Sequence, residues 1–488
     1  MTDLVLIHPG AVHGIYGPLG ETLVAVEPPL WCRIIASYFL GRGRSVAIVD
    51  QEAERMSAQE VAACVDALDP RLVAICVHGH QPSASTQQMA GARAVAVCLD
   101  NRHRVIMLGN HPSALPARTL REEPVDYVCD GEGPLTIEGL LQDKHPGLIP
   151  GLVWEHEGRV IQNPRAPLLD MDRDLHGSSA WHLLPMERYA AHNWQCLDDP
   201  ARRRPYASIH TSLGCSFKCS FCCINIFQHN NLYRRRDPHS VVAEMLMLYN
   251  QHGVRTFKIT DELFVLNRTH FRSICDLLVS SGIADDINVW AYSRTDTVRD
   301  EDLPLLRAAG IRWLALGIES GSARVRAGAN KALRRDDDNS DIRRTVDAIR
   351  AADINVIGNY IVGLPDDDLE SMEETYRLAA NLNTEFMNVY SAMAYPGSPL
   401  YDQAVAEGWT LPASWAGYSQ HNEHARPLDT KHVSGAEVLR FRDDFFRRYY
   451  ARPEYLDMVR ARFGDAAIEE IQKMTRYELK RNLLEAVR

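Results

Sequence analysis

The chain has 488 residues, of which 45% are hydrophobic and 24% charged, and its formal net charge is -11. This composition is typical of a globular protein and argues against a disordered or fibrous chain, while the excess of acidic residues argues against nonspecific nucleic-acid binding. No apolar run approaches the roughly 20 residues that cross a bilayer and no signal peptide is evident, so we expect a cytoplasmic protein without membrane or nucleic-acid partners, and with reduced cysteines.

The first 145 residues alternate short apolar strands with helical patterns. Strands are expected at 4–7, 45–50, 72–77, 104–108 and 127–129, and helices at 29–40, 58–68 and 83–99. Apolar strands with helical crossovers predict a doubly wound, Rossmann-like α/β domain, which binds ligands beyond the carboxyl ends of its strands. No Gly-x-Gly-x-x-Gly opens a helix here, and this disfavours a dinucleotide site.

A proline-rich segment, 146–200, is expected to be a structured linker to a second alternation. Strands are expected at 206–212, 256–260, 288–292, 313–318, 355–362 and 386–394, and helices at 240–250, 268–280, 302–309, 341–352 and 369–382. This pattern predicts a partial (β/α)6 barrel over 201–408, with its chemistry at the carboxyl ends of the strands. Residues 409–488 should be mainly helical: a capping box at Ser434 precedes a helix at 438–450 that Pro453 ends, and a last helix runs from about 465 through Leu483.

Three cysteines follow the first expected barrel strand in the pattern Cys215-x-x-x-Cys219-x-x-Cys222. Thiolates are soft ligands that suit iron–sulfur clusters or zinc. A structural zinc site usually takes a fourth ligand from a second paired motif, which this chain lacks. We therefore predict a 4Fe-4S cluster with one iron open to a further ligand, and zinc or three unrelated buried cysteines are the alternatives.

This motif, with Phe221 before its last cysteine, resembles that of the radical S-adenosylmethionine superfamily. The resemblance implies that Cys215, Cys219 and Cys222 hold a 4Fe-4S cluster whose open iron binds S-adenosylmethionine. It further implies reductive cleavage to a 5′-deoxyadenosyl radical that abstracts hydrogen from an unactivated carbon. An external one-electron reductant such as flavodoxin or ferredoxin is expected as a partner.

Motifs at the later strand ends extend the resemblance and supply the candidates for binding S-adenosylmethionine. Carboxylates pair with its ammonium group, and arginine can form a fork with its carboxylate. The candidates are Phe221, Asp261, Glu262, Ser293, Arg294, Glu319, Ser320 and Asn359. Alternatively, Asp261 and Glu262 cap the helix that follows them, and Glu319 is an ordinary ion-paired residue.

A doubly wound domain ahead of such a barrel resembles the cobalamin-binding subclass of this superfamily. The candidates for binding cobalamin are Pro28, Glu52, His80, Ser83, Gly109, Asn110, His111, Gly131 and Glu132. Many cobalamin proteins carry Asp-x-His-x-x-Gly, whose histidine ligates cobalt, but here Asp50 is followed by Glu52 and Arg55 at those positions. The resemblance therefore implies cobalt without a lower histidine ligand. Alternatively, His80 and His111 are ordinary loop histidines, and Ser83 caps a helix.

The resemblance to this subclass implies a class B methyltransferase that methylates an unactivated carbon of a small-molecule or sugar-type substrate. The substrate radical would take the methyl group from methylcobalamin. Cyclisation, rearrangement or oxidation with the same cofactors is the main alternative, and a non-catalytic cobalamin or redox sensor is another. Methylthiotransfer is disfavoured because the N-terminal cysteines are scattered through core-like segments. The sequence identifies no catalytic residue beyond the cofactor sites.

Overall fold

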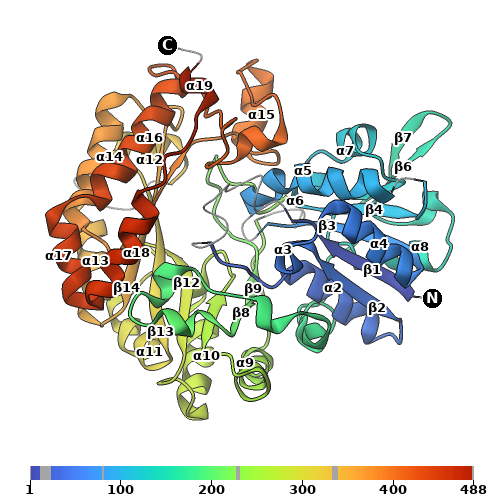
Figure 1. Cartoon of the computed structure of the whole chain (residues 1–488), viewed down its shortest axis with the longest axis horizontal. Coiled ribbons are helices and arrows are strands. Elements are labelled where there is room, and N and C mark those ends of the chain that lie inside the picture. The colour runs from blue at the N-terminus through green and yellow to red at the C-terminus, as the bar shows by residue number, and fades with distance from the viewer. Residues whose placement is uncertain are drawn as a thin grey trace.

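The computed structural model places an N-terminal sheet domain beside a larger barrel, with the C-terminal helices packed on the barrel (Figure 1). The structure describes residues 2–10, 24–79, 82–99, 101–226, 231–331 and 339–485, except for the side chains of 82–84. None of the described helices combines the length and apolar character needed to cross a bilayer.

The first sheet is the expected doubly wound one. Its parallel strands lie in the order β2-β1-β3-β4-β5, formed by β1 (Thr2–His8), β2 (Val46–Asp50), β3 (Pro70–Val77), β4 (Val105–Gly109) and β5 (Tyr127–Cys129). Leu4 and Leu6 pack against α2 (Leu30–Leu40) and α8 (Pro134–Leu141), whereas Val5 and Ile7 pack against α4 (Ala58–Leu68) and α5 (Pro82–Leu99). Alternate side chains of one strand thus build the core on both faces.

This sheet continues past residue 145, where we expected it to end. The hairpin of β6 (Leu152–His156) and β7 (Arg159–Gln162) adds two antiparallel strands, with Val153 opposite Val128 of β5. The physical reason is that the hairpin pairs with backbone groups at the open edge of β5, which would otherwise stay unpaired. The expected linker is therefore part of the sheet up to Gln162, and the other domain bounds stay predictions.

The second sheet confirms the partial barrel. All of its strands are parallel, in the order β15-β14-β13-β12-β11-β8, and β8 does not pair with β15. The strands are β8 (Tyr206–Ile209), β11 (Thr256–Ile259), β12 (Asn288–Arg294), β13 (Ile311–Glu319), β14 (Asn355–Val362) and β15 (Phe386–Ser391). The crossover helices are α9 (Pro238–His252), α10 (Arg268–Ser281), α11 (Leu303–Ala308), α13 (Ser340–Ala351) and α14 (Leu369–Leu382). The expected first strand is interrupted after Ile209, and its last part forms β9 (Ser212–Leu213), which pairs with β10 (Arg234–Arg235).

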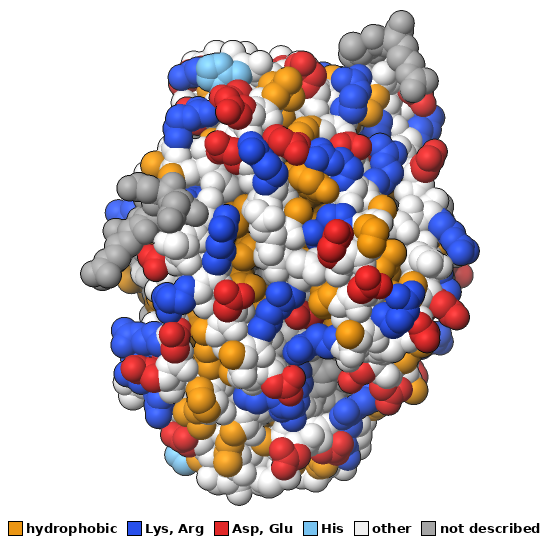
Figure 2. All heavy atoms as spheres, turned by 90° about the vertical axis from the view of Figure 1, so that its left-hand side faces the viewer, with side chains coloured by type: hydrophobic (Ala, Val, Ile, Leu, Met, Phe, Trp, Pro, Cys, Tyr) orange, Lys and Arg blue, Asp and Glu red, His pale blue; other side chains and the backbone are white. Residues whose placement is uncertain are grey.

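The C-terminal region is helical, as expected, but its helices differ from the prediction. α16 (Gly435–Tyr450) begins at the Ser434 capping box. Pro453 does not end helical structure there: it opens α17 (Pro453–Phe463), because proline lacks only an N–H that the first turn of a helix leaves unpaired. α18 (Asp465–Thr475) ends well before Leu483, and α19 (Asn482–Glu485) follows it. On the face that these helices form, basic and acidic side chains are interspersed (Figure 2).

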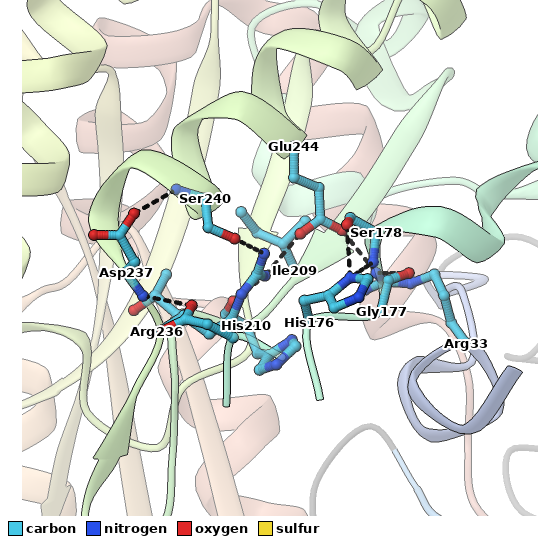
Figure 3. A network of polar contacts seen from close by, with 12 residues as sticks. Arg33, His176, Gly177, Ser178, Ile209, His210, Arg236, Asp237, Ser240 and Glu244 are labelled. Atoms are coloured by element: carbon cyan, nitrogen blue, oxygen red, sulfur yellow. Dashed lines mark hydrogen bonds and ion pairs between the residues drawn. The ribbon is translucent and has the colours of Figure 1, made fainter. Parts of the chain in front are cut away.

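A buried charge cluster joins the sheet domain to the barrel (Figure 3). Glu244 of α9 accepts hydrogen bonds from Arg33 of α2 and from Arg236, each at 2.7 Å, and from Trp181 Nε1 at 2.8 Å. All three charged side chains have no solvent exposure. Burial alone would raise the pKa of Glu244, but the two arginines outweigh burial and lower this pKa. The cluster therefore keeps its carboxylate charged inside the interface.

Candidate active site

The cysteine loop borders a large cavity inside the barrel. Cys215, Cys219 and Cys222 all line this cavity, whose volume is about 1170 Å³. Asn225 Nδ2 donates to the carbonyl of Cys215 at 2.9 Å, and the Cys222 N–H donates to the carbonyl of Cys219 at 3.2 Å. These bonds close the loop on itself, and all three cysteines border the same cavity.

The three thiols suit a multinuclear cluster better than a single ion. Within the described part of the chain, no three His, Cys, Asp or Glu side chains converge closely enough to hold one metal ion. A 4Fe-4S cluster takes each thiolate on a different iron and so does not need such convergence. Burial raises the pKa of the Cys219 thiol, and the cations of Lys331 and Arg294 oppose this shift and favour the thiolate that iron needs.

Arg294 lies beside the cysteine loop at the end of β12. Its Nη1 is 3.6 Å from Cys219 Sγ, and its guanidinium lies 3.9 Å from the ring centroid of Phe217. Asp296 accepts from Nε at 2.8 Å and from Nη2 at 3.0 Å, which fixes the guanidinium plane. Arg294 is therefore placed to meet an anionic group bound next to the cluster.

Most of the other candidates for S-adenosylmethionine border the same cavity. Glu319 stands at a bulge of β13 with φ of 65° and forms an ion pair with Lys331. Glu262 accepts from the Gly214 N–H at 2.9 Å, and burial raises the pKa of this carboxyl to about 8. The candidates that line the cavity are Phe221, Glu262, Ser293, Arg294, Glu319 and Asn359.

Asp261 and Ser320 do not line the cavity. The Asp261 carboxylate is fully buried and accepts from the backbone N–H and hydroxyl of Thr211, so it holds the turn between β8 and β9. The alternative that Asp261 and Glu262 cap the next α-helix is wrong, because Asn267 caps α10. Ser320 lies 3.2 Å from the Thr375 hydroxyl and accepts from the Ser322 N–H. Through these contacts, both residues stabilise the structure that surrounds the cavity.

Sequence analysis did not single out Lys258, which lies in the barrel interior. Its ammonium group pairs with both carboxylate oxygens of Glu27, at 2.9 and 3.0 Å, and lies 4.9 Å from the ring of Trp290. The sequence carried a signal of a buried ion pair, because this lysine interrupts an otherwise apolar short strand and a charged residue is rarely buried without a partner. Its partner, from the loop after β1, left no such signal.

A smaller cavity of about 80 Å³ lies where the sheet domain meets the barrel mouth. Pro28 and Asn110 line it from the sheet domain, together with His78, whose Nδ1 is 2.9 Å from Asn110 Oδ1. Glu27, Thr260, Ile224 and Glu262 line both this cavity and the larger one. The carboxyl edge of the first sheet therefore faces the cysteine loop.

The glycines at this edge suit a bulky ligand. A Cβ at Gly109 would stand 2.0 Å from the Val77 carbonyl oxygen, so no other residue fits there. At Gly131 the backbone has φ of 136°, and no atom lies within 4 Å of where a Cβ would be, which leaves its backbone open. The smaller cavity alone is too small for a corrin ring, but the larger cavity also reaches Ala25 and Gln87 of the sheet domain. Together these features fit cobalamin between the two domains.

Two further cobalamin candidates, Glu52 and Glu132, do not line either cavity. Glu52 Oε2 is 4.0 Å from His8 Nε2 and lines neither cavity. Glu132 forms an ion pair with Arg234 and accepts from the Leu169 N–H at 2.9 Å, so these contacts account for its burial. His80 and the side chain of Ser83 lie outside the described residues.

His111 is buried against the C-terminal region. Its ring stands edge-on to Trp415 at 4.4 Å, and its Nδ1 is 3.1 Å from the Thr86 hydroxyl. Burial lowers the pKa of His111 to about 3, and the Arg118 cation adds to this shift. The contact ties the short helix Trp415–Tyr418 to the sheet domain.

This lowered pKa predicts a loss of stability in acid. Below the unfolded pKa of about 6.5, the unfolded chain takes a proton that folded His111 does not, so the free energy of unfolding falls as the pH falls. Between about pH 7.5 and about pH 5.5, His111→Gln should lose about 1.4 kcal/mol less than wild type in urea unfolding. The exposed His239→Gln should lose as much as wild type; an equal loss in both variants would contradict the assignment.

Comparison with known proteins agrees with this geometry. A model of the radical SAM superfamily matches residues 209–379, and a model of the B12 binding domain matches residues 17–141. A protein of Pyrococcus horikoshii described as an uncharacterized methyltransferase is 27% identical over 93% of both chains. The anaerobic magnesium-protoporphyrin IX monomethyl ester cyclase of Rubrivivax gelatinosus is 27% identical over 80% of this chain and 69% of its own.

A solved structure shares the fold over almost the whole chain. The radical S-adenosylmethionine methyltransferase TsrM from Kitasatospora setae, solved with cobalamin and a [4Fe-4S] cluster, superposes with a TM-score of 0.69 at 18% identity, covering 93% of this chain and 90% of its own. At this identity the likeness is one of fold. The two family models, together with the cysteine loop, show that the chain belongs to the cobalamin-binding enzymes of the radical S-adenosylmethionine superfamily, whose cofactors are a 4Fe-4S cluster, S-adenosylmethionine and cobalamin.

Proposed function

We propose that this enzyme methylates an unactivated carbon of a small-molecule or sugar-type substrate. The observation that carries the proposal is the shared wall between the two cavities, in which Glu27, Thr260, Ile224 and Glu262 face both the cysteine loop and the edge of the first sheet. A carbon held at this wall has a radical source on one side and a methyl donor on the other. The larger cavity, at about 1170 Å³, has room for S-adenosylmethionine and a small molecule.

The residues of the chain hold and orient the cofactors and line the shared wall. Cys215, Cys219 and Cys222 hold the cluster, and Arg294 orients the carboxylate of S-adenosylmethionine beside Cys219. Glu262, neutral or charged near neutral pH, can accept or donate a hydrogen bond at the shared wall. When bound, the cofactors supply a hydrogen-abstracting radical and a transferable methyl group. An external one-electron reductant is needed to start each cycle.

The relatives favour two outcomes for the substrate radical. The Pyrococcus relative is described as a methyltransferase and matches nearly the whole chain, which supports methyl transfer. The Rubrivivax relative is described as a cyclase, and this favours cyclisation as the second candidate function. A sensor without turnover is disfavoured, because the cavity provides for a substrate in addition to the cofactors.

Labelled methyl transfer tests the proposal. The full chain is reconstituted anaerobically with iron, sulfide and cobalamin, then reduced and incubated with methyl-deuterated S-adenosylmethionine and a small-molecule extract. We expect 5′-deoxyadenosine together with a product that carries the deuterated methyl group, detected by mass spectrometry. Omitting cobalamin should abolish the labelled product and leave deoxyadenosine formation.

Two outcomes would count against methylation. A new product without label, formed alongside deoxyadenosine, would assign the enzyme to cyclisation, rearrangement or oxidation. Reduced protein with a full cluster that forms no deoxyadenosine would instead support a sensor.

A further inference from the structure

The open side of the barrel is closed by a wall that carries excess positive charge. This wall consists of α16, which lies along β15, and the final residues 474–485. Because β15 is the last strand of the sheet, its outer backbone groups need partners from elsewhere. Arg442 of α16 supplies one, since its Nε donates to the Val389 carbonyl at 3.0 Å. Arg442 also lines the cavity.

A second arginine joins Arg442 at one carboxylate. Arg442 Nη1 donates to Asp443 at 2.9 Å, and Arg481 donates to the same carboxylate through Nε and Nη2, both at 2.9 Å. The arginine side chains are 6% and 3% exposed, and all three residues line the cavity. Burial alone would raise the pKa of Asp443, but the arginines outweigh burial and lower it, so the carboxylate is charged. Two buried cations thus share a single anion.

Three other buried cations of this cavity each pair with one carboxylate, and Glu262 on the same wall supplies little negative charge at neutral pH, because burial raises its pKa to about 8. Within the described residues, each remaining buried cation on its wall has its own carboxylate, in the pairs Lys258–Glu27, Lys331–Glu319 and Arg294–Asp296. The exposed charges near the arginine pair do not restore the balance, because Lys480 pairs with Glu423 at 2.9 Å and the others are two cations and two acids, namely Arg440, Arg447, Glu478 and Glu485. A buried charge without a partner costs free energy, so an anion is expected at this wall when the site is filled.

The neighbouring histidine does not change the charge balance at this wall. His421 also lines the cavity, and burial lowers its pKa to about 3, with Arg442 and Arg481 adding to the shift. It is therefore neutral near pH 7 and adds no third cation.

We infer that the substrate carries an oxyanion, a carboxylate or a phosphoryl group, which binds between Arg442 and Arg481 at this wall. Guanidinium groups form forked hydrogen bonds with such groups, and their weak hydration suits a buried position. Held by its anionic end, the substrate would extend along the cavity toward the cysteine loop. This inference rests on the proposed function, because it names the chemical class of that substrate.

Calorimetric titration of the full chain with small anions tests the inference. Inorganic phosphate and acetate are titrated separately at constant ionic strength, without S-adenosylmethionine. Wild type should bind at least one of them saturably, and the preferred anion assigns the group as phosphoryl or carboxylate. Arg481→Gln and Arg442→Gln should each raise the dissociation constant about tenfold.

Two further variants separate charge from damage to the fold. Asp443→Asn removes the one carboxylate that the arginines share, so it should lower the dissociation constant several-fold, which a damaged fold cannot do. Arg460→Gln, on α17, exposed and outside the lining of the cavity, should bind like wild type. No saturable binding by wild type, unchanged binding by Arg481→Gln or weaker binding by Asp443→Asn would each overturn the inference.

The titration is independent of catalysis. Failure of the labelling experiment with intact anion binding would reject methylation and keep the anion subsite. Labelled product without anion binding would support methylation and reject the anion subsite.

Discussion

Cys219→Ala is expected to remove most of the bound iron and to reduce 5′-deoxyadenosine formation to background. Cys219 lies between the other two cysteines of the loop and 3.6 Å from Arg294, so its loss removes a proposed iron ligand and one contact of Arg294. Two remaining thiolates leave a second iron exposed to solvent and oxidant. Iron and sulfide content, visible absorption and deoxyadenosine yield after anaerobic reconstitution measure the effect.

The control for this variant is another cysteine outside the loop. Cys98 lies on α5 of the sheet domain, is partly exposed and lines neither cavity. Cys98→Ala should bind as much iron and form as much deoxyadenosine as wild type. A Cys219→Ala protein that keeps its full iron content would show that the cluster is held elsewhere, and the proposed function would fail with it.

Glu244→Gln is expected to lower the free energy of unfolding by about 3–5 kcal/mol. The substitution keeps the size of the side chain but leaves Arg33 and Arg236 fully buried without a counter-charge. The two cations then repel each other across the interface between the sheet domain and the barrel. Urea unfolding, followed by fluorescence and circular dichroism, measures the change.

An exposed ion pair provides the comparison. Asp300 pairs with Arg344 at 3.1 Å, with both side chains more than half exposed. Asp300→Asn should cost less than about 1 kcal/mol, because water screens such pairs. A Glu244→Gln protein that loses no more than Asp300→Asn would mean that the interface tolerates the uncompensated arginines.

Elements with a complete local pattern could be predicted from the sequence. β14 (Asn355–Val362) and α14 (Leu369–Leu382) match their expected bounds, since an apolar strand and an amphipathic helix stand between clear breaks. The errors in helix ends arose where a residue or a pattern is compatible with more than one structure. Helix α16 ends at Tyr450, as expected, but Pro453 also opens α17, and the apolar spacing that runs to Leu483 does not reveal that α18 ends at Thr475.

The residues of the candidate site could likewise be predicted from the sequence only in part. The resemblance to the superfamily predicted Arg294, Glu319 and Asn359 as site residues, and all three line the cavity. It did not tell which neighbouring side chains turn away, because Asp261 turns toward Thr211 only once the barrel has formed. The Lys258–Glu27 pair joins positions 231 apart, and no local pattern links residues at that distance.

The charge pairs across the interface bear on how this chain can be engineered. Cutting it before the barrel would place Lys258 and Glu244 on one fragment, and Glu27 and Arg33 on the other, so that each of these side chains would lose its buried partner. Neither fragment is then expected to behave as an autonomous module. Swapping cobalamin modules between homologues should succeed only when both members of each pair travel together.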